Sequence, residues 1–298
     1  MSGRPANLGR MQDADGLYSM VAVDQRDSLR TMLAQSGSAP VTDDQMREFK
    51  VKVARALSPV ASALLVDTDL GLQPILDADA LAQGCDLIVA VDAISYTPQG
   101  VARATALRKD LLGEAWDERV AGLKFLLLWT PGQWLGCDQA EVQQFIDEAA
   151  RAGADSVLEV VVREADGSPP SPGRQAQLLV EAAKQTAPLG ATLYKTEVPY
   201  RNQASSEDVT QASALISDSV TCPWVVLSSG VPGGQFPQAV QRTARGGAQG
   251  FLAGRAVWRN ATAIPEQAAA SYLSSESVAT MAALREALRA GRAGHVDA

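Results

Sequence analysis

Short apolar runs rich in β-branched residues alternate with amphipathic stretches along the whole chain. Eight of these runs predict strands, at 17–24, 62–67, 86–92, 123–129, 156–162, 192–198, 224–230 and 250–255. The stretches between them carry the period of amphipathic helices, at 27–35, 43–57, 138–152, 174–186, 206–217 and 236–245. Alternating strands and helices favour a parallel sheet with right-handed crossovers, and eight such units close naturally into a barrel. We therefore expect an α/β protein with a (β/α)8 TIM-barrel fold.

The length of the chain, 298 residues, fits one barrel of about 250 residues with short extensions. Hydrophobic residues make up 46% of the chain, which is enough for a large core. The segment 165–173, rich in Pro, Gly and Ser, follows a predicted strand and precedes a helix, so we interpret it as a βα loop over the active face. We expect a single domain over 1–298, with a short polar N-terminal segment and a C-terminal capping helix over 276–292 that packs outside the barrel. The alternative fold, an open doubly wound sheet, lacks a GxGxxG turn after its first strand.

The charge distribution argues against several classes of partner. The net charge is −8, and Lys and Arg form no cluster of the kind that binds nucleic acids or anionic membranes. No apolar run approaches the roughly 18 residues of a membrane span, and the N-terminal segment lacks the apolar core of a signal peptide. We expect a cytoplasmic enzyme that binds a small molecule, contacts neither nucleic acid nor membrane, and forms a homo-oligomer.

Histidine and cysteine are too sparse for several kinds of catalysis. His295 is the single histidine and lies in a polar tail, which excludes Ser-His and Cys-His catalysis and multi-histidine zinc sites. Cys85, Cys137 and Cys222 form no CxxC motif, which predicts reduced core thiols. We expect neither a metal nor a cofactor, and proton transfer then falls to carboxylates, lysines or tyrosines.

Polar residues at the strand ends are the first candidates for chemistry, because the site of a TIM-barrel enzyme lies at the carboxyl ends of its strands. These residues are Asp24, Gln25, Arg26, Asp67, Asp92, Glu159, Lys195, Glu197, Ser228, Ser229, Gly230, Gly254 and Arg255.

Two lysines and one carboxylate stand out within apolar strands. Lys124 and Lys195 occupy the fourth and sixth predicted strands, and alternate strands share layers inside a barrel, so their amines can meet in its interior. Burial and a second cation would lower the pKa of one amine, as a Schiff-base enzyme requires. Glu159 lies on the strand between them and suits a general acid/base. The alternatives are a surface lysine for Lys195 and a merely structural ion pair for Glu159.

The ends of the last two strands have the composition of an anion site. Small residues from Ser228 to Gly234, together with Gly254 and Arg255, occupy the position where barrels of this type bind phosphate. Backbone N–H groups at a helix start plus one arginine fork can hold a phosphate or a sulfonate. A plain glycine turn is the alternative interpretation of the first segment.

With these residues located, the chain resembles the metal-independent, Schiff-base (class I) aldolases that include tagatose 1,6-bisphosphate aldolase. It resembles still more the 6-deoxy-6-sulfofructose-1-phosphate aldolases of sulfoquinovose breakdown. The similar segments follow one another in the order of that family, at 20–26, 56–67, 193–199, 226–231 and 250–258. Beyond Pro199 the chain departs from the sulfosugar pattern, where Arg201 could add a charge near the site.

The resemblance implies a role for each candidate. Lys195 matches the Schiff-base lysine, Glu159 the acid/base carboxylate and Lys124 the second lysine of the site. Carboxylates that orient sugar hydroxyls or lysines correspond to Asp24 and Asp67, and substrate or anion contacts to Gln25, Arg26, Ser229, Gly230, Gly254 and Arg255.

The implied reaction is cleavage of 6-deoxy-6-sulfofructose 1-phosphate into dihydroxyacetone phosphate and 3-sulfolactaldehyde. A modest supply of cations at the strand ends favours a singly charged sulfonate over a second phosphate. Two alternatives stay open: an aldolase for tagatose 1,6-bisphosphate or a related ketose bisphosphate, and a sugar-phosphate binding protein without catalysis on the same scaffold.

Overall fold

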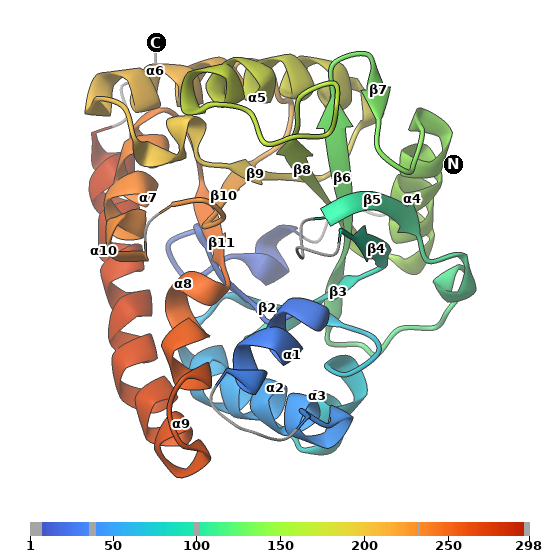
Figure 1. The fold of residues 1–298 in the computed structure, drawn as a ribbon, viewed down its shortest axis with the longest axis vertical. Coiled ribbons are helices and arrows are strands. Elements are labelled where there is room, and N and C mark those ends of the chain that lie inside the picture. The colour runs from blue at the N-terminus through green and yellow to red at the C-terminus, as the bar shows by residue number, and fades with distance from the viewer. Residues whose placement is uncertain (1–7, 36–39, 98–101, 232, 295–298) are drawn as a thin grey trace.

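A closed ring of parallel strands forms the centre of the computed structural model, which describes residues 8–35, 40–97, 102–231 and 233–294. The strands of the ring are β1 (Tyr18–Ala22), β2 (Ala63–Asp67), β3 (Asp86–Ala90), β6 (Val120–Thr130), β8 (Asp155–Val162), β9 (Leu193–Glu197), β10 (Trp224–Leu227) and β11 (Gly250–Ala253). Each pairs in parallel with the next, and β11 returns to pair with β1, so the ring has no free edge (Figure 1). The predicted eight-stranded TIM barrel is confirmed.

Helices surround this ring on the outside (Figure 1). They are α1 (Asp27–Ala34), α2 (Asp43–Leu57), α3 (Leu72–Asp77), α4 (Gln139–Ala152), α5 (Pro172–Thr186), α6 (Ser206–Ser217), α7 (Phe236–Arg245), α8 (Arg255–Trp258), α9 (Glu266–Tyr272) and α10 (Val278–Ala293). The helix α10 lies along α7 on the outer wall, where a terminal helix was expected. It continues from a π-helical turn, Leu273–Ser277, and not from the predicted start at residue 276.

Local capping explains why several helix boundaries follow from the sequence. The side chains of Thr42, Asp138, Ser171 and Ser205 each accept a backbone N–H from the first turn of the following helix. At the end of α4, Gly153 adopts φ 67°, a left-handed conformation that glycine tolerates best. The capped helices α2 and α6 begin and end at the predicted residues, and so does α7, which has no side-chain cap.

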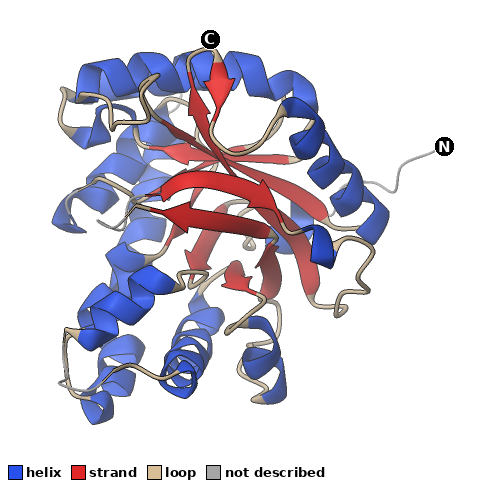
Figure 2. Ribbon diagram, turned by 45° about the vertical axis from the view of Figure 1, so that its right-hand side comes forward, coloured by secondary structure: helices blue, strands red, loops and turns tan. Residues whose placement is uncertain are grey.

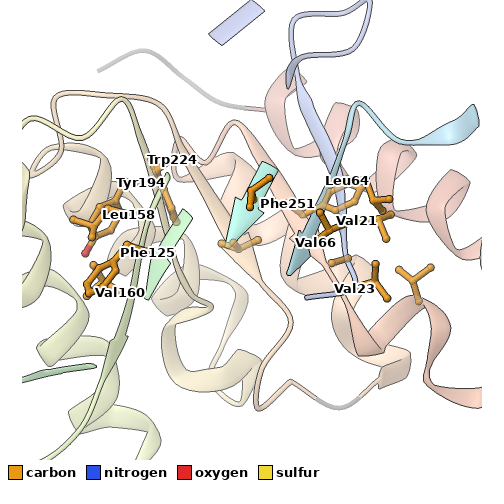
Figure 3. Packing of buried hydrophobic residues seen from close by; sticks show 14 of the residues in the cluster. Val21, Val23, Leu64, Val66, Phe125, Leu158, Val160, Tyr194, Trp224 and Phe251 are labelled. Atoms are coloured by element: carbon orange, nitrogen blue, oxygen red, sulfur yellow. The ribbon is translucent and has the colours of Figure 1, made fainter. Parts of the chain in front are cut away.

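The two-residue alternation of the strands divides the core into two parts. Side chains that point outward pack under the helices (Figure 3), and they include Val21, Val66, Phe125, Leu158, Tyr194 and Phe251. Side chains that point inward fill the barrel itself, and they include Tyr18, Met20, Leu65, Ile88, Val157, Leu193, Val225 and Leu252. Met11, in the short N-terminal turn, is buried with this inner set. The same alternation directs Lys124, Glu159 and Lys195 into the barrel, one step beyond the inner apolar layer.

A hairpin that we did not predict interrupts the third βα unit. The predicted strand 86–92 ends at Ala90, and Asp92 begins a new strand, β4 (Asp92–Tyr96), which pairs antiparallel with β5 (Ala102–Leu107). In Figure 2 this hairpin crosses in front of the barrel strands. A short strand β7 (Gln133–Trp134) also folds back on β6. The hairpin brings Ile94 and Tyr96 to the carboxyl end of the barrel, where both line a cavity.

Three further sequence expectations concern the rest of the chain. The three cysteines are unpaired, with Cys85 buried and the other two partly buried. Among the residues that the structure describes, no helix has both the length and the apolar character needed to cross a membrane. His295 lies outside the described residues.

Candidate active site

A cavity of about 280 Å³ opens at the carboxyl ends of the barrel strands. Most of the predicted site residues line it: Asp24, Gln25, Lys124, Glu159, Lys195, Ser229, Gly254 and Arg255. They come from strands or strand ends between β1 and β11, so only the closed ring brings them together. Three predicted residues, Arg26, Asp67 and Gly230, are not part of the lining.

Both lysines share one carboxylate at the centre of the cavity. Glu159 Oε2 lies 2.9 Å from Nζ of Lys195 and 3.0 Å from Nζ of Lys124. The side chains of Lys195 and Lys124 are only 5% and 2% exposed, which rules out surface positions for them. In the sheet register Glu159 is level with Lys195 on the neighbouring strand. The predicted meeting of two lysines inside the barrel is therefore confirmed, with the carboxylate between them.

Lys124 is held firmly in the charged form. Its ammonium group also contacts Asp92 at 2.9 Å and Asp24 at 3.2 Å. Burial alone would lower the pKa of Lys124, but the carboxylates of Asp92, Glu159 and Asp24 together raise it well above its usual value. The expectation that two close lysines would lower the pKa of one amine is therefore wrong for Lys124, because three acidic neighbours outweigh one cation.

The carboxylates of the cluster are held in the ionised form. Burial would raise the pKa of Glu159, but the ammonium groups of Lys124 and Lys195 outweigh it and lower the pKa. The pKa of Asp24 is lowered in the same way, against its burial, chiefly by the same two lysines. At neutral pH the centre of the cavity therefore holds ionised carboxylates, and one of them, Glu159, contacts Nζ of Lys195.

The residues of the predicted anion site lie only partly at the cavity. Ser229, Gly254 and Arg255 line one side of the cavity together with Ser228. A Cβ atom on Gly254 would lie 3.2 Å from Nε2 of Gln25, so a glycine here permits the close approach of that amide. Oε1 of Gln25 is buried and has no hydrogen-bond partner among the described residues. Gly230 has φ +77° and packs against the side chain of Arg201, so it supports the turn without facing the cavity.

Asp67 and Arg26 have structural partners instead of places in the cavity. Asp67 is fully buried, forms an ion pair with Lys50 and accepts the backbone N–H of Leu70 at 2.8 Å. Arg26 donates to the carbonyl oxygen of Asp92 at 3.1 Å and lies 3.5 Å from Asp69. Both residues come at the ends of apolar strands, as site residues do. However, Lys50 on α2 pairs with Asp67, and the Asp92 carbonyl at the start of the hairpin accepts a hydrogen bond from Arg26.

Asp92, which the sequence named only as a polar strand end without a role, holds Lys124 and the backbone N–H of Leu126 through one carboxylate oxygen. Sequence reasoning missed two further residues, Tyr96 and Arg163. Tyr96 lines the cavity, and burial together with the nearby Asp24 carboxylate raises the pKa of its phenol. Arg163 lines the cavity directly after β8. The alternation of Ile94 and Tyr96 was the signal that could have identified the hairpin.

Two observations concern whether the cluster could hold a metal ion. Within the described residues, no group of three or more His, Cys, Asp and Glu side chains could hold a metal ion. The three carboxylates nearest the cavity centre instead surround the ammonium group of Lys124.

Comparisons with curated proteins give similarity along almost the entire chain. Tagatose 1,6-diphosphate aldolase 2 of Enterococcus faecalis is 24% identical over 316 residues, covering 97% of this chain and 94% of that protein. The protein of the same name from Streptococcus pyogenes serotype M1 is 26% identical over 310 residues, covering 92% and 91%.

Solved structures share the fold at lower identity. A fructose-bisphosphate aldolase from Slackia heliotrinireducens has a TM-score of 0.58 at 19% identity, covering 98% of this chain and 91% of its own. An archaeal fructose-1,6-bisphosphate aldolase, solved with its catalytic lysine bound to a carbinolamine intermediate, has a TM-score of 0.59 at 11% identity, covering 92% and 97%.

A family model described as DeoC/LacD family aldolase matches residues 18–260. The match runs from the first strand of the ring to beyond the last, and it includes every residue of the lysine–carboxylate cluster. The chain therefore belongs to the DeoC/LacD family of aldolases and is a carbon–carbon lyase.

Proposed function

We propose that this protein is a class I aldolase in which Lys195 forms a Schiff base with the C2 carbonyl of a ketose 1-phosphate. The observation that carries the proposal is the shared carboxylate: Glu159 lies 2.9 Å from Nζ of Lys195. Lys124 is already surrounded by carboxylates, whereas Glu159 is the single ion-pair partner of Lys195 among the described residues. Lys195 is thus the lysine that can exchange its proton and attack.

The steps follow from this arrangement. A proton passes from Nζ of Lys195 to Glu159, and the free amine adds to C2 to give a carbinolamine. Glu159 returns the proton to the departing hydroxyl, so water leaves and a protonated imine forms. The imine accepts the electron pair of the C3–C4 bond while Glu159 removes the proton of the C4 hydroxyl, which releases an aldehyde. Protonation of the resulting enamine at C3, followed by hydrolysis, releases dihydroxyacetone phosphate and regenerates Lys195.

The preferred substrate in this proposal is 6-deoxy-6-sulfofructose 1-phosphate, which would give 3-sulfolactaldehyde as the second product. The sequence resemblance supports it, as does the small number of cations around the cavity, because a sulfonate carries one charge where phosphate carries nearly two. Tagatose 1,6-bisphosphate is the second candidate, because similar curated proteins from several bacteria carry the name tagatose 1,6-diphosphate aldolase.

Reductive trapping tests the mechanism. Incubation with dihydroxyacetone phosphate and borohydride should leave a stable adduct on the peptide that contains Lys195, detected by mass spectrometry. The variant Lys195→Met should lose both the adduct and activity, whereas Lys184→Met, at an exposed position on α5, should keep both. Absence of an adduct in the unaltered protein, or activity in Lys195→Met, would refute the Schiff base. A binding protein without catalysis would show no turnover with any of the sugars.

Cleavage rates then decide the substrate. We expect the highest kcat/KM with sulfofructose 1-phosphate, followed by tagatose 1,6-bisphosphate and fructose 1,6-bisphosphate, and activity should survive EDTA. A clear preference for tagatose 1,6-bisphosphate would overturn the sulfonate assignment and leave the mechanism intact. We also propose a homo-oligomer, which light scattering of the purified protein measures directly.

A further inference from the structure

Four cationic side chains line the cavity as far as the structure describes it: Lys124, Arg163, Lys195 and Arg255. The two lysines are ion-paired with carboxylates. In contrast, no carboxylate oxygen of the described residues lies within 4 Å of the guanidinium group of Arg163 or Arg255. Two cations that face the cavity therefore have no ion-pair partner among the described residues, and an anionic group of a ligand could provide one.

The hydrogen bonds of Arg163 leave one edge of its guanidinium unused. Nη1 donates to the carbonyl oxygen of Val162 at 2.8 Å. Nε is buried, and neither it nor Nη2 has a hydrogen-bond partner within the described part of the chain. The Nε–Nη2 edge of arginine is a planar fork that matches two oxygens of a sulfonate, phosphate or carboxylate group. An unsatisfied buried donor of this kind costs free energy unless a ligand completes it.

The surroundings of Arg163 increase its positive potential. Burial lowers the pKa of Arg163; the Glu197 carboxylate opposes this effect, and the positive charge of Arg201 adds to it. The carboxylate of Glu197 already has a hydrogen-bond partner, because its Oε2 accepts the backbone N–H of Val162 at 3.0 Å. Burial raises the pKa of Glu197. Leu128 and Val161 belong to an apolar cluster at this end of the cavity, where charges are less screened than in water.

Arg201 is held in place by an unusual turn. Three consecutive residues that are not glycine, Tyr200, Arg201 and Asn202, have φ values of 57°, 48° and 62°. Such left-handed conformations are strained and persist when surrounding contacts hold them. Nη2 of Arg201 donates to the carbonyl oxygen of Pro170 at 2.9 Å, and a Cβ atom on Gly230 would lie 2.9 Å from its Cδ. The turn therefore fixes a second positive charge beside Arg163.

The order of strands places the reactive lysine between the two arginines. Arg163 follows β8, Lys195 lies on β9, and Arg255 follows β11, with β8, β9, β10 and β11 adjacent in that order around the ring. Ser229 lies in the loop after β10, and Arg255 begins α8 directly beyond β11, where barrels of this type bind phosphate. A ketose bound there through its C1 phosphate would extend past Lys195 with its other end toward β8.

We propose that Arg163 forms a second anion subsite, which binds a sulfonate or phosphate on the far end of the substrate, while Arg255 binds the C1 phosphate. This inference rests on the proposed Schiff-base function and deepens it. It makes Arg163 the residue that selects for the second anionic group of the substrate.

The test compares substrates with one and two anionic ends. For Arg163→Gln, kcat/KM with sulfofructose 1-phosphate and with tagatose 1,6-bisphosphate should each fall on the order of 10- to 100-fold more than with fructose 1-phosphate, since a lost charge-assisted hydrogen bond has this magnitude. In the unaltered protein, the ratio of kcat/KM with sulfofructose 1-phosphate to kcat/KM with tagatose 1,6-bisphosphate identifies whether the subsite prefers a sulfonate or a phosphate. Arg174→Gln, a partly exposed arginine on α5, is the matched control and should leave all ratios unchanged.

The subsite would be overturned if Arg163→Gln lowered kcat/KM equally with all three substrates. It would also be overturned if kcat/KM did not change with any of them. Trapping of dihydroxyacetone phosphate on Lys195 separates this result from failure of the proposed function, since that ligand has no far end. If the adduct forms but selectivity is unchanged, only the subsite is refuted. If Arg163→Gln does not fold, Arg163→Lys provides the same comparison, because it keeps the charge and removes the planar fork.

Discussion

Two buried lysines in this molecule meet carboxylates in different ways. Lys50, on α2, is completely buried with Asp67, and its ammonium group also donates to the carbonyl oxygens of Val23 and Gln25, each at 2.9 Å. Its three N–H groups are therefore all used. No cavity-lining residue takes part through its side chain, so this pair fixes the backbone around Asp24 and has no proton to exchange with a ligand.

Lys124 is as deeply buried, but its partners open onto the cavity. Asp24 and Glu159 are both 13% exposed, and Glu159 also holds Lys195. The comparison indicates that burial of a lysine beside a carboxylate does not by itself identify chemistry. A reactive arrangement additionally needs a carboxylate that is shared with a second lysine and is accessible to substrate.

The largest effect should follow from breaking the shared carboxylate. Glu159→Gln keeps the shape of the side chain but removes its ability to take a proton, so kcat should fall on the order of 10²- to 10⁴-fold. Steady-state release of dihydroxyacetone phosphate measures this. Glu164→Gln, which alters a partly exposed carboxylate in the loop after β8, should retain nearly all activity. A kcat for Glu159→Gln above one tenth of the normal value would exclude Glu159 as the acid/base.

Loss of the fully buried Lys50–Asp67 ion pair should change the stability of the protein more than its catalytic rate. Lys50→Met leaves the Asp67 carboxylate buried without its cation, which should cost about 3–5 kcal/mol of unfolding free energy. The double variant Lys50→Met/Asp67→Leu should recover most of this loss, because no isolated charge remains. Urea unfolding measures both variants. If the double variant is as unstable as the single one, the cost comes from lost packing and not from the unpaired charge.

The next effect in size should come from acid, which should lower the unfolding free energy through the carboxylates at the cavity, Asp24 and Glu159. The folded-state pKa values of Asp24 and Glu159 are lowered, so these groups contribute stability above their unfolded pKa values near 4, and the contribution is lost as pH falls through the folded values. Below about pH 4, the unfolding free energy of Glu159→Gln should therefore decrease less steeply than that of the unaltered protein, by up to about 1.4 kcal/mol per pH unit. Identical slopes in urea titrations would contradict the lowered pKa of Glu159.

The smallest effect is expected at Arg26, which the sequence pattern assigned to the substrate. Its guanidinium is engaged with Asp69 and with the carbonyl of Asp92, so Arg26→Ala should change KM by less than about threefold. Arg255→Ala, at the cavity wall, serves as the comparison and should raise KM clearly more. Equal increases would restore Arg26 to the binding site and indicate that the loop moves when substrate binds.

The parts of the fold that depend on regular periods could be predicted from the sequence. The alternation of strands with helices predicted the ring, and the layers shared by alternate strands predicted that Lys124 and Lys195 meet in its interior. The hairpin was missed because Asp92 continues the apolar run of β3 without a break, although the chain turns between them at Val91. Strand ends were extended too far at β10 and β11, where Ser228 and Gly254 already lie in loops.

The distinction between Asp24 and Asp67 could not be predicted, since each follows an apolar strand. Their roles differ because Lys50 on α2 reaches Asp67, whereas Lys124 on β6 reaches Asp24. Both contacts join residues far apart in the chain, and the packing of helix on barrel decides them. Arg163 was missed for a related reason: its proposed role depends on its having no ion-pair partner within the described part of the chain, which only the folded chain reveals.

The position of β11 has a consequence for how the enzyme is made. Lys124, Glu159 and Lys195 all precede residue 200, yet the ring closes only when Gly250–Ala253 pairs with β1 on one side and β10 on the other. A nascent chain therefore carries its reactive lysine well before it has a sealed pocket to protect it. In the proposed mechanism, the site around Lys195 is complete only once β11 has paired with both β1 and β10.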